Sequence, residues 1–146
     1  ADVRSEKSIA KAVAKLTYAF ANANVPKVNV ITGEAYGSAY VTMNSKALGA
    51  DVTYAWPDAS IGMMDANEAA KIMYADDIAK SADVQSVISE KAAEYAALQS
   101  GVESAAARGY VDTIINPEDT RKYVAAAFEM LYTKREDRPD KKHGTV

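Results

Sequence analysis

The hydrophobic positions between residues 25 and 49 predict a strand, a tight turn and the start of a helix. Residues 28–31 form a short run rich in β-branched side chains, which is typical of an inner strand. Gly33 and Gly37 let the chain turn sharply, and from Ser38 the apolar residues recur at three- and four-residue spacing. The first N–H groups of such a helix have no acceptor within it, and the positive end of the helix dipole lies behind them. The turn is therefore expected to accommodate an anion or a developing oxyanion.

The rest of the chain alternates helical patterns with short strand patterns. Apolar spacing predicts helices over residues 5–23, 66–74, 82–99, around 105–107 and from 117 onwards, and strands over 52–57, 60–64 and 110–115. Asp76 and Asp77 are expected to form a surface turn between two of the helices. This order predicts a single domain of the α/β class with short strands. The chain opens directly on a helix, so the central strand lacks the preceding strand that would usually flank it.

Several side chains are assigned to packing or to solvent by their spacing. The first helix is expected to bury one apolar face and to expose a stripe of lysines; the face consists of Ile9, Val13, Leu16 and Phe20, and the stripe of Lys7, Lys11 and Lys15. Trp56, Met63 and Met64 have two candidate roles, lining a pocket and packing in the core, and core packing is the expected one. Asn116 is the expected cap of the last helix, whose buried stripe is Val124, Ala127, Phe128 and Leu131. Residues 134–146 are expected to cross the surface or to reach a partner.

Composition removes several classes of function. The 146 residues include 17 basic and 20 acidic side chains, giving a net charge of −3, and the two signs are mixed along the chain. No basic patch with interleaved aromatic residues indicates a nucleic-acid surface. Cysteine is absent, which excludes disulfides, thiol nucleophiles and thiolate metal ligands, and the single histidine, His143, argues against a metal centre. No apolar run is long enough for a membrane span, so a cytoplasmic protein is expected.

A serine hydrolase is the first enzyme class to compare with the residues present. Ser38 would be the nucleophile, but Tyr40 stands where the G-x-S-x-G elbow has its closing glycine. The only histidine available as a base, His143, lies four residues from the chain end, and no lysine is marked out by its context for a Ser–Lys dyad. Hydrolysis is therefore disfavoured.

Paired carboxylates and phosphate-binding loops are the next classes. The acidic residues that lie close together, Asp65, Glu68, Asp76 and Asp77, fall in a segment that reads as exposed helix and turn. Neither G-x-x-x-x-G-K nor G-x-G-x-x-G occurs. What remains is chemistry without a side-chain acid or base, in which the backbone N–H groups of Gly37, Ser38 and Ala39 stabilise an oxyanion.

Two motifs extend this reading beyond physical patterns. Ala-Trp-Pro at residues 55–57 and Ala-Ala-Arg-Gly-Tyr-Val-Asp at residues 106–112 are the most distinctive, and weaker matches are spread over nearly the whole chain. Together they resemble the carboxyltransferase (β) subunits of biotin-dependent acyl-CoA carboxylases and decarboxylases. The weaker matches lie at residues 25–27, 30–32, 35–37, 39–40, 45–46, 49–51, 59–61, 114–115, 117, 120–121 and 141–144.

The resemblance implies a fold and a place in a larger assembly. The fold would be the crotonase/Clp-protease-like spiral of ββα units, and residues 1–146 would be the C-terminal, biotin-facing domain, incomplete at its N-terminus. The expected partners are an acyl-CoA substrate, a carrier protein that holds biotin, an N-terminal carboxyltransferase domain and further copies of the chain in a homo-oligomer. Because the family's site lies between two domains, the isolated chain is expected to be inactive.

The resemblance also assigns site residues. Gly37, Ser38 and Ala39 match the Gly-Gly-Ala whose N–H groups hold the ureido oxygen of biotin, although Ser38 replaces the second glycine. Tyr36, Tyr40 and Val41 are expected to line the substrate, and Val41 stands at the position implicated in acyl-chain selection. Two other hypotheses stay open: a non-catalytic assembly module of the same fold, and a crotonase-type hydratase or isomerase, which would need a positioned carboxylate.

Overall fold

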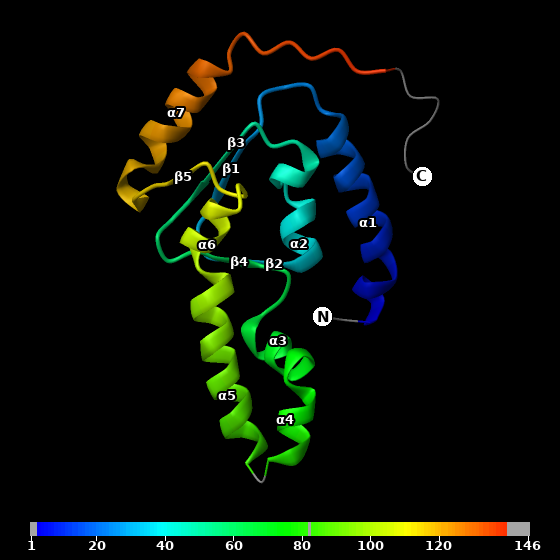
Figure 1. Ribbon diagram of the computed structural model, residues 1–146. Helices are drawn as coiled ribbons and strands as arrows, with labels where there is room; N and C mark the ends of the chain where they lie inside the picture. Colours follow the sequence, from blue (N-terminus) through cyan, green and yellow to red (C-terminus); the bar gives the residue numbers. More distant parts are fainter. Residues whose placement is uncertain (1–2, 82, 140–146) are drawn as a thin grey trace.

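The computed structural model describes residues 3–81 and 83–139, in which two small parallel sheets are surrounded by helices (Figure 1). Helix α1, Val3–Asn22, precedes the strand β1, Val28–Ile31, and most of the later elements are short. They are β2 Glu34–Tyr36, α2 Gly37–Thr42, the 3₁₀ turn η1 Lys46–Leu48, β3 Val52–Ala55, β4 Ser60–Gly62, α3 Ala66–Met73, α4 Ala75–Lys80, α5 Val84–Tyr95, the π-helical turn η2 Ala96–Ser100, α6 Val102–Ala107, β5 Thr113–Ile114, the 3₁₀ turn η3 Pro117–Asp119 and α7 Thr120–Met130.

The strands form two parallel sheets, and the chain passes from the first sheet to the second in the same way twice. The three-stranded sheet has the order β1-β3-β5, and Val28 aligns with Val52 in its parallel register. The second sheet pairs β2 with β4 in parallel, with Tyr36 opposite Gly62. Twice along the chain, a strand of the three-stranded sheet is followed by a strand of the two-stranded sheet and then by a helix. The first unit is β1-β2-α2 and the second is β3-β4-α3. These are the ββα units that the sequence led us to expect.

Small side chains build the core between the sheets and α6. One buried cluster joins Ile31, Ala55 and Ile61 to Val102 and Ala105 of α6. Alanine at these positions lets the helix approach the strands closely, and Val102 is the largest of the fully buried side chains. A second cluster places α7 on the three-stranded sheet through Tyr54, Ile115 and Ala127. Trp56 packs against that second cluster, as expected, and its Nε1–H donates to Thr120 Oγ1 at 3.0 Å.

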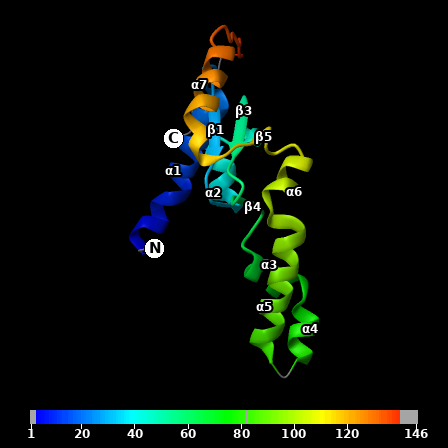
Figure 2. The ribbon, with the colours of Figure 1, turned by 90° about the vertical axis from the view of Figure 1, so that its left-hand side faces the viewer.

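Helices α3, α4 and α5 project from the sheets as a helical hairpin (Figures 1 and 2). The prediction of a surface turn at Asp76 and Asp77 was wrong, because both lie in the first turn of α4, where carboxylates favour the helix N-terminus. The helix expected over residues 82–99 ends earlier, and its chain continues as the π-helical turn η2. Of its predicted apolar face, Ile88 is buried, whereas Leu98 is exposed.

The segment after β2 differs most from its prediction. The expected continuous helix from Ser38 to residue 49 is wrong, since α2 ends at Thr42 and Asn44 takes a positive φ of 60°. Its first residue is Gly37, and the three residues before it form strand β2 rather than part of the expected tight turn. The three later strands are also shorter than expected: β3 ends at Ala55, β4 ends at Gly62, and the last is confined to β5.

Two helices leave part of their apolar residues uncovered. The helix predicted near the start of the chain is present as α1, but its face is not buried: Ile9 is 56 % exposed, Val13 37 % and Leu16 39 %. Lys11 and Lys15 are exposed, as expected. On α7, Ala127 is buried and Phe128 is exposed, and Asn116 makes no side-chain cap. Met63 was expected in the core but is 76 % exposed.

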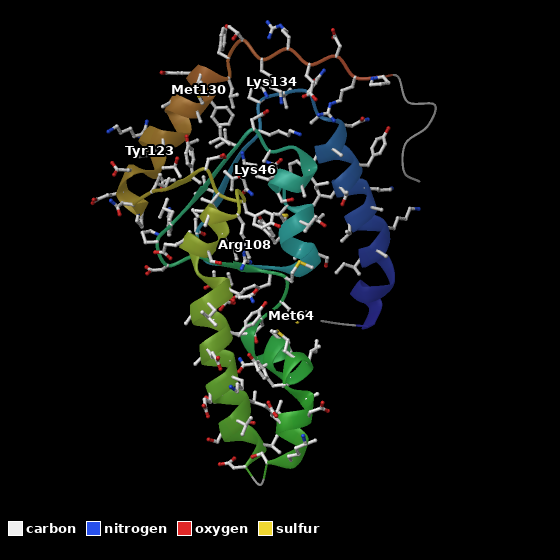
Figure 3. The ribbon with its side chains drawn as sticks, in the orientation of Figure 1. Lys46, Met64, Arg108, Tyr123, Met130 and Lys134 are labelled. Carbon is white, nitrogen blue, oxygen red and sulfur yellow. The ribbon has the colours of Figure 1, made fainter. Side chains whose placement is uncertain are left out.

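A charged cluster joins the chain after α7 to the start of β1. Lys134 Nζ donates to both carboxylate oxygens of Asp51, at 2.8 and 2.9 Å (Figure 3). The backbone N–H of Lys27 donates to the same carboxylate at 2.7 Å. Arg138 pairs with Glu136 and donates to the carbonyl oxygen of Ala21. The described part of the predicted tail therefore crosses the surface; His143 and its neighbours lie outside the described residues.

Candidate functional site

The turn from β2 into α2 strongly favours a glycine at its corner. Gly37 has a φ of +60°, which side chains rarely adopt, and a Cβ there would lie 3.1 Å from the carbonyl oxygen of Met63. That carbonyl follows β4, whose pairing with β2 brings the two chains together. The neighbouring sheet therefore shapes this corner, and a larger residue would displace the start of α2.

The N-terminus of α2 presents backbone donors without a side-chain cap. Tyr36 is the N-cap residue, in an extended conformation with φ −118° and ψ 144°, and its side chain makes no capping hydrogen bond. The first turn carries no acidic side chain. The N–H groups of Gly37, Ser38 and Ala39 have no acceptor within the helix, and both Ser38 and Ala39 are exposed. This arrangement suits an external acceptor oxygen.

A cavity of about 390 Å³ lies beside this N-terminus, between β1, β2 and α2. Of the six residues that the sequence proposed, it is lined by Tyr36, Ala39 and Tyr40. The other three, Gly37, Ser38 and Val41, are outside the lining, with Gly37 turned toward Met63. The remaining lining residues are Asn29, Val30, Ile31, Thr32, Gly33, Glu34, Ala35 and Met43.

Tyr40 connects the cavity to the core. Its ring packs against the cluster around Ile31 and Val102, and its hydroxyl is buried without a hydrogen-bond partner among the described residues. Burial raises the pKa of Tyr40, and the nearby Tyr110 raises it further. The phenol therefore stays protonated, and the ring forms a wall of the cavity rather than a base within it.

Three polar groups of this region were missed by the sequence reasoning. Thr42 and Ser45 are buried, and each hydroxyl donates to the carbonyl oxygen four residues earlier, Ser38 O at 2.7 Å and Val41 O at 2.9 Å. Their one signal in the sequence is that each is a hydroxyl residue within a helical pattern, where it can donate to the carbonyl oxygen four residues earlier. Glu34, an exposed carboxylate, lines the cavity from the start of β2.

The other candidates from the sequence lie away from this cavity. Asp65 caps α3 by accepting from the N–H of Asn67 at 2.9 Å, and that hydrogen bond lowers the pKa of Asp65. Glu68 pairs with Lys71 on the exposed side of α3. Within residues 3–81 and 83–139, no group of three or more His, Cys, Asp or Glu side chains is placed to hold a metal ion. No helix in that part of the chain is both long and apolar enough to cross a bilayer.

Comparison with known families and sequences identifies the family of the chain. Residues 3–146 match the family described as the carboxyl transferase domain. The propionyl-CoA carboxylase beta chain of Saccharopolyspora erythraea is 48 % identical over 137 residues, which cover 91 % of this chain and 25 % of that protein. The methylmalonyl-CoA carboxyltransferase 12S subunit of Propionibacterium freudenreichii subsp. shermanii is 45 % identical over 131 residues, covering 90 % of this chain and 25 % of the relative. The chain thus spans about a quarter of the length of these relatives.

Solved structures give the same result for the fold. A transcarboxylase 12S crystal structure, a hexamer with methylmalonyl-CoA and methylmalonic acid bound, superposes with a TM-score of 0.91 at 42 % identity, covering 99 % of this chain and 28 % of that one. The beta subunit of geranyl-CoA carboxylase from P. aeruginosa shares the fold, with a TM-score of 0.78 at 24 % identity. These likenesses confirm the crotonase-type ββα fold, and the match of residues 3–146 to the carboxyl transferase domain confirms the family expected from the sequence motifs.

Proposed function

Because this chain belongs to the carboxyl transferase domain family, we propose that it forms the biotin-facing part of an enzyme that transfers a carboxyl group between carboxybiotin and an acyl-CoA. The observation that carries the proposal is the uncapped N-terminus of α2, which begins at a glycine that no other residue can replace without strain. The names of the relatives support the reaction class, since both act in carboxyl transfer on acyl-CoA substrates.

The chain's own contribution would be electrostatic. Biotin, held on a partner protein, supplies the transferable carboxyl group and a ureido oxygen that becomes negative when that group leaves. The N–H groups of Gly37, Ser38 and Ala39 would donate to this oxygen and so stabilise the charge as it develops. A ureido oxygen fits these donors, because it is an acceptor that carries no bound cation. No acidic side chain in the first turn of α2 competes with it for the N–H groups. The side chain of Ser38 would lie at the edge of the same turn.

The cavity beside α2 would receive the reacting groups. Tyr36 and Tyr40 form part of its wall, and Val41, exposed on α2 next to that wall, would face the acyl group at the mouth. An apolar side chain at this position favours an acyl chain over a charged group. The acyl-CoA itself, a biotin carrier, an N-terminal carboxyltransferase domain and further copies of the chain are the partners that the proposal requires.

The first test is biotin-dependent decarboxylation of malonyl-CoA and methylmalonyl-CoA. The chain would be assayed alone and together with a separately made N-terminal half of its Saccharopolyspora erythraea relative. We expect turnover only in the mixture, and only when biotin is added, because this chain supplies the donors for one substrate. Turnover by the isolated chain would contradict a site shared between the two pieces. The absence of turnover in both samples would contradict the proposed reaction.

A second candidate function is assembly without catalysis. The exposed apolar side chains Ile9, Val13 and Leu16 on α1 favour it, because a contiguous uncovered face is typical of an interaction surface. Association that increases with concentration, measured by sedimentation, together with no biotin-dependent turnover in the mixture, would support this candidate over the transferase.

A further inference from the structure

Helix α2 is held together by two buried side-chain hydroxyls. Thr42 Oγ1 donates to the carbonyl oxygen of Ser38 at 2.7 Å, and Ser45 Oγ donates to that of Val41 at 2.9 Å. Thr42 is 6 % exposed and Ser45 1 %. The helix has only six residues and lacks a side-chain cap, so few backbone hydrogen bonds fix its first turn. Its hydroxyl bonds are therefore a large part of what holds it.

The bond from Thr42 acts on a peptide group that belongs to the proposed site. The carbonyl of Ser38 and the N–H of Ala39 are the two ends of one planar peptide unit and point in opposite directions. A hydrogen bond that fixes the oxygen therefore also fixes the direction of the N–H. It polarises the unit as well, which makes the N–H of Ala39 a stronger donor.

We infer that Thr42 is a positioning residue for carboxyl transfer: its hydroxyl holds the Ser38–Ala39 peptide so that the Ala39 N–H is directed at the developing oxyanion. The inference rests on the proposed function, in which that N–H is one of three donors. Ala39 is one of the residues that line the cavity beside α2, where the proposed function places the reacting groups. Thr42 itself is buried and does not line the cavity, so it acts through the peptide.

A threonine that bonds the carbonyl four residues back is also a common feature of helices with no role in a site. Ser45 provides the matched comparison, because it makes the same kind of bond in the same segment and is equally buried. The peptide unit that Ser45 holds joins Val41 to Thr42, whose N–H points back along the helix toward Ser38 and not out of the first turn. A purely structural role predicts similar effects of losing either hydroxyl, whereas the positioning role concerns Thr42 alone.

The kinetic test uses Thr42→Val, Thr42→Ser and Ser45→Ala in the mixture of this chain with the N-terminal half. Valine keeps the shape of threonine without the hydroxyl, and serine restores the hydroxyl. We expect Thr42→Val to lower kcat about tenfold, less than the loss of a whole oxyanion donor, with the KM for malonyl-CoA within about twofold of wild type. Thr42→Ser should recover most of kcat, and Ser45→Ala should keep it within about twofold.

A second readout does not depend on activity. In the ¹⁵N-labelled chain, Thr42→Val should move the amide proton of Ala39 upfield, as expected for a weaker donor, and Ser45→Ala should leave it in place. An unchanged Ala39 amide in Thr42→Val would overturn the inference, as would a Ser45→Ala variant whose kcat falls as far as that of Thr42→Val. Inactivity of the wild-type mixture would instead overturn the proposed function, while the amide shift would still decide whether Thr42 holds the peptide.

Discussion

The two ends of one segment, from Lys27 to Thr42, satisfy their polar groups in opposite ways. At the start of β1, Lys27 is 5 % exposed and its donors have acceptors within the protein: its N–H donates to Asp51, and its Nζ donates to the carbonyl oxygens of Phe20 and Leu48, at 2.9 and 3.4 Å. At the start of α2, backbone N–H groups of exposed residues have neither a helical acceptor nor a side-chain cap.

This difference separates stability from function. A buried ammonium group is tolerated only when its hydrogen bonds and counter-charges are present, so the Lys27 end is expected to contribute to folding. Donors left without protein acceptors contribute little to folding but can bind an external oxygen. The three predictions that follow test whether each end behaves according to its bonding, beginning with the largest expected effect.

Substituting Gly37 should damage activity far more than stability explains. Gly37→Val would bring a side chain against the carbonyl oxygen of Met63, 3.1 Å from the Cβ position, and would displace the first turn of α2. We expect kcat of the reconstituted mixture to fall about a hundredfold, the effect of losing a preorganised oxyanion donor. Steady-state biotin-dependent decarboxylation measures it.

The control for that substitution is Gly109→Val. Gly109 also has a positive φ, +82°, but no atom lies within 4 Å of its Cβ position, so the backbone strain is matched and the crowding is absent. It should lower the melting temperature to a similar extent while kcat stays within about threefold of wild type. Equal losses of kcat in the two variants would mean that α2 has no special part in the reaction.

Removing the charge of Asp51 should destabilise the fold without changing the site. Asp51→Asn would remove the charge that pairs with Lys134 and acts on the nearby ammonium group of Lys27 in a partly buried cluster, and we expect a loss of about 2 kcal/mol in the free energy of unfolding. Urea unfolding followed by far-ultraviolet circular dichroism measures it. When kcat is calculated per folded molecule, the variant should have the wild-type value.

An exposed ion pair gives the matched comparison. Lys71 and Glu68 lie 2.8 Å apart on α3, with half or more of each side chain exposed, so Lys71→Met should cost about 0.5 kcal/mol or less. If Lys71→Met and Asp51→Asn destabilised the chain equally, burial would have no part in the strength of the cluster.

The same cluster sets an acid dependence of stability. Burial alone would raise the pKa of Asp51, but the hydrogen bonds from Lys134 and from the N–H of Lys27, together with both lysine charges, outweigh it and hold the pKa below its ordinary value of 3.8. A carboxylate with a lowered pKa contributes stability that is present above that ordinary value and is lost as pH falls through the lower, folded-state pKa. The free energy of unfolding should therefore fall in that acid range.

Asp51→Asn should make this acid dependence shallower, because the variant has no carboxylate to protonate at that position. Asp58→Asn, at an exposed carboxylate between β3 and β4, should keep most of the wild-type slope. Urea titrations at a series of pH values between about 2.5 and 6 would show both slopes. A wild-type slope retained in Asp51→Asn would contradict the role of the cluster.

Local patterns were enough for much of the fold. The β-branched run that became β1, the strand from Val52 and the helices α1, α3 and α5 were all found from spacing, because each contains its own periodic signal. The two glycines around β2 marked the turn, and the resemblance pointed to the donors at its end. Whether those donors hold biotin stays a prediction.

Apolar spacing alone did not give the length of α2. Apolar spacing continues from Tyr40 through Met43 to Leu48, yet the helix stops at Thr42, because Asn44 adopts a positive φ and its carbonyl accepts from Asn29 of β1. Asparagine adopts a positive φ more readily than most residues, so Asn44 was a local stop signal that the apolar spacing did not include, and the hydrogen bond from Asn29, fifteen residues away, supports the break. The turn predicted at the acidic residues of α4 was wrong for a different reason. A helix N-terminus stabilises negative charges, so the same residues can begin a helix.

The sequence by itself determined the α/β class, the glycine corner and the family, because composition, short-range periodicity and motifs are properties of neighbouring residues. Only the tertiary structure decided the rest. It placed Met63 against Gly37, brought Lys134 to Asp51 across 83 residues, and left the apolar face of α1 uncovered. These outcomes depend on which distant segments meet, and that is settled by the packing of the two sheets.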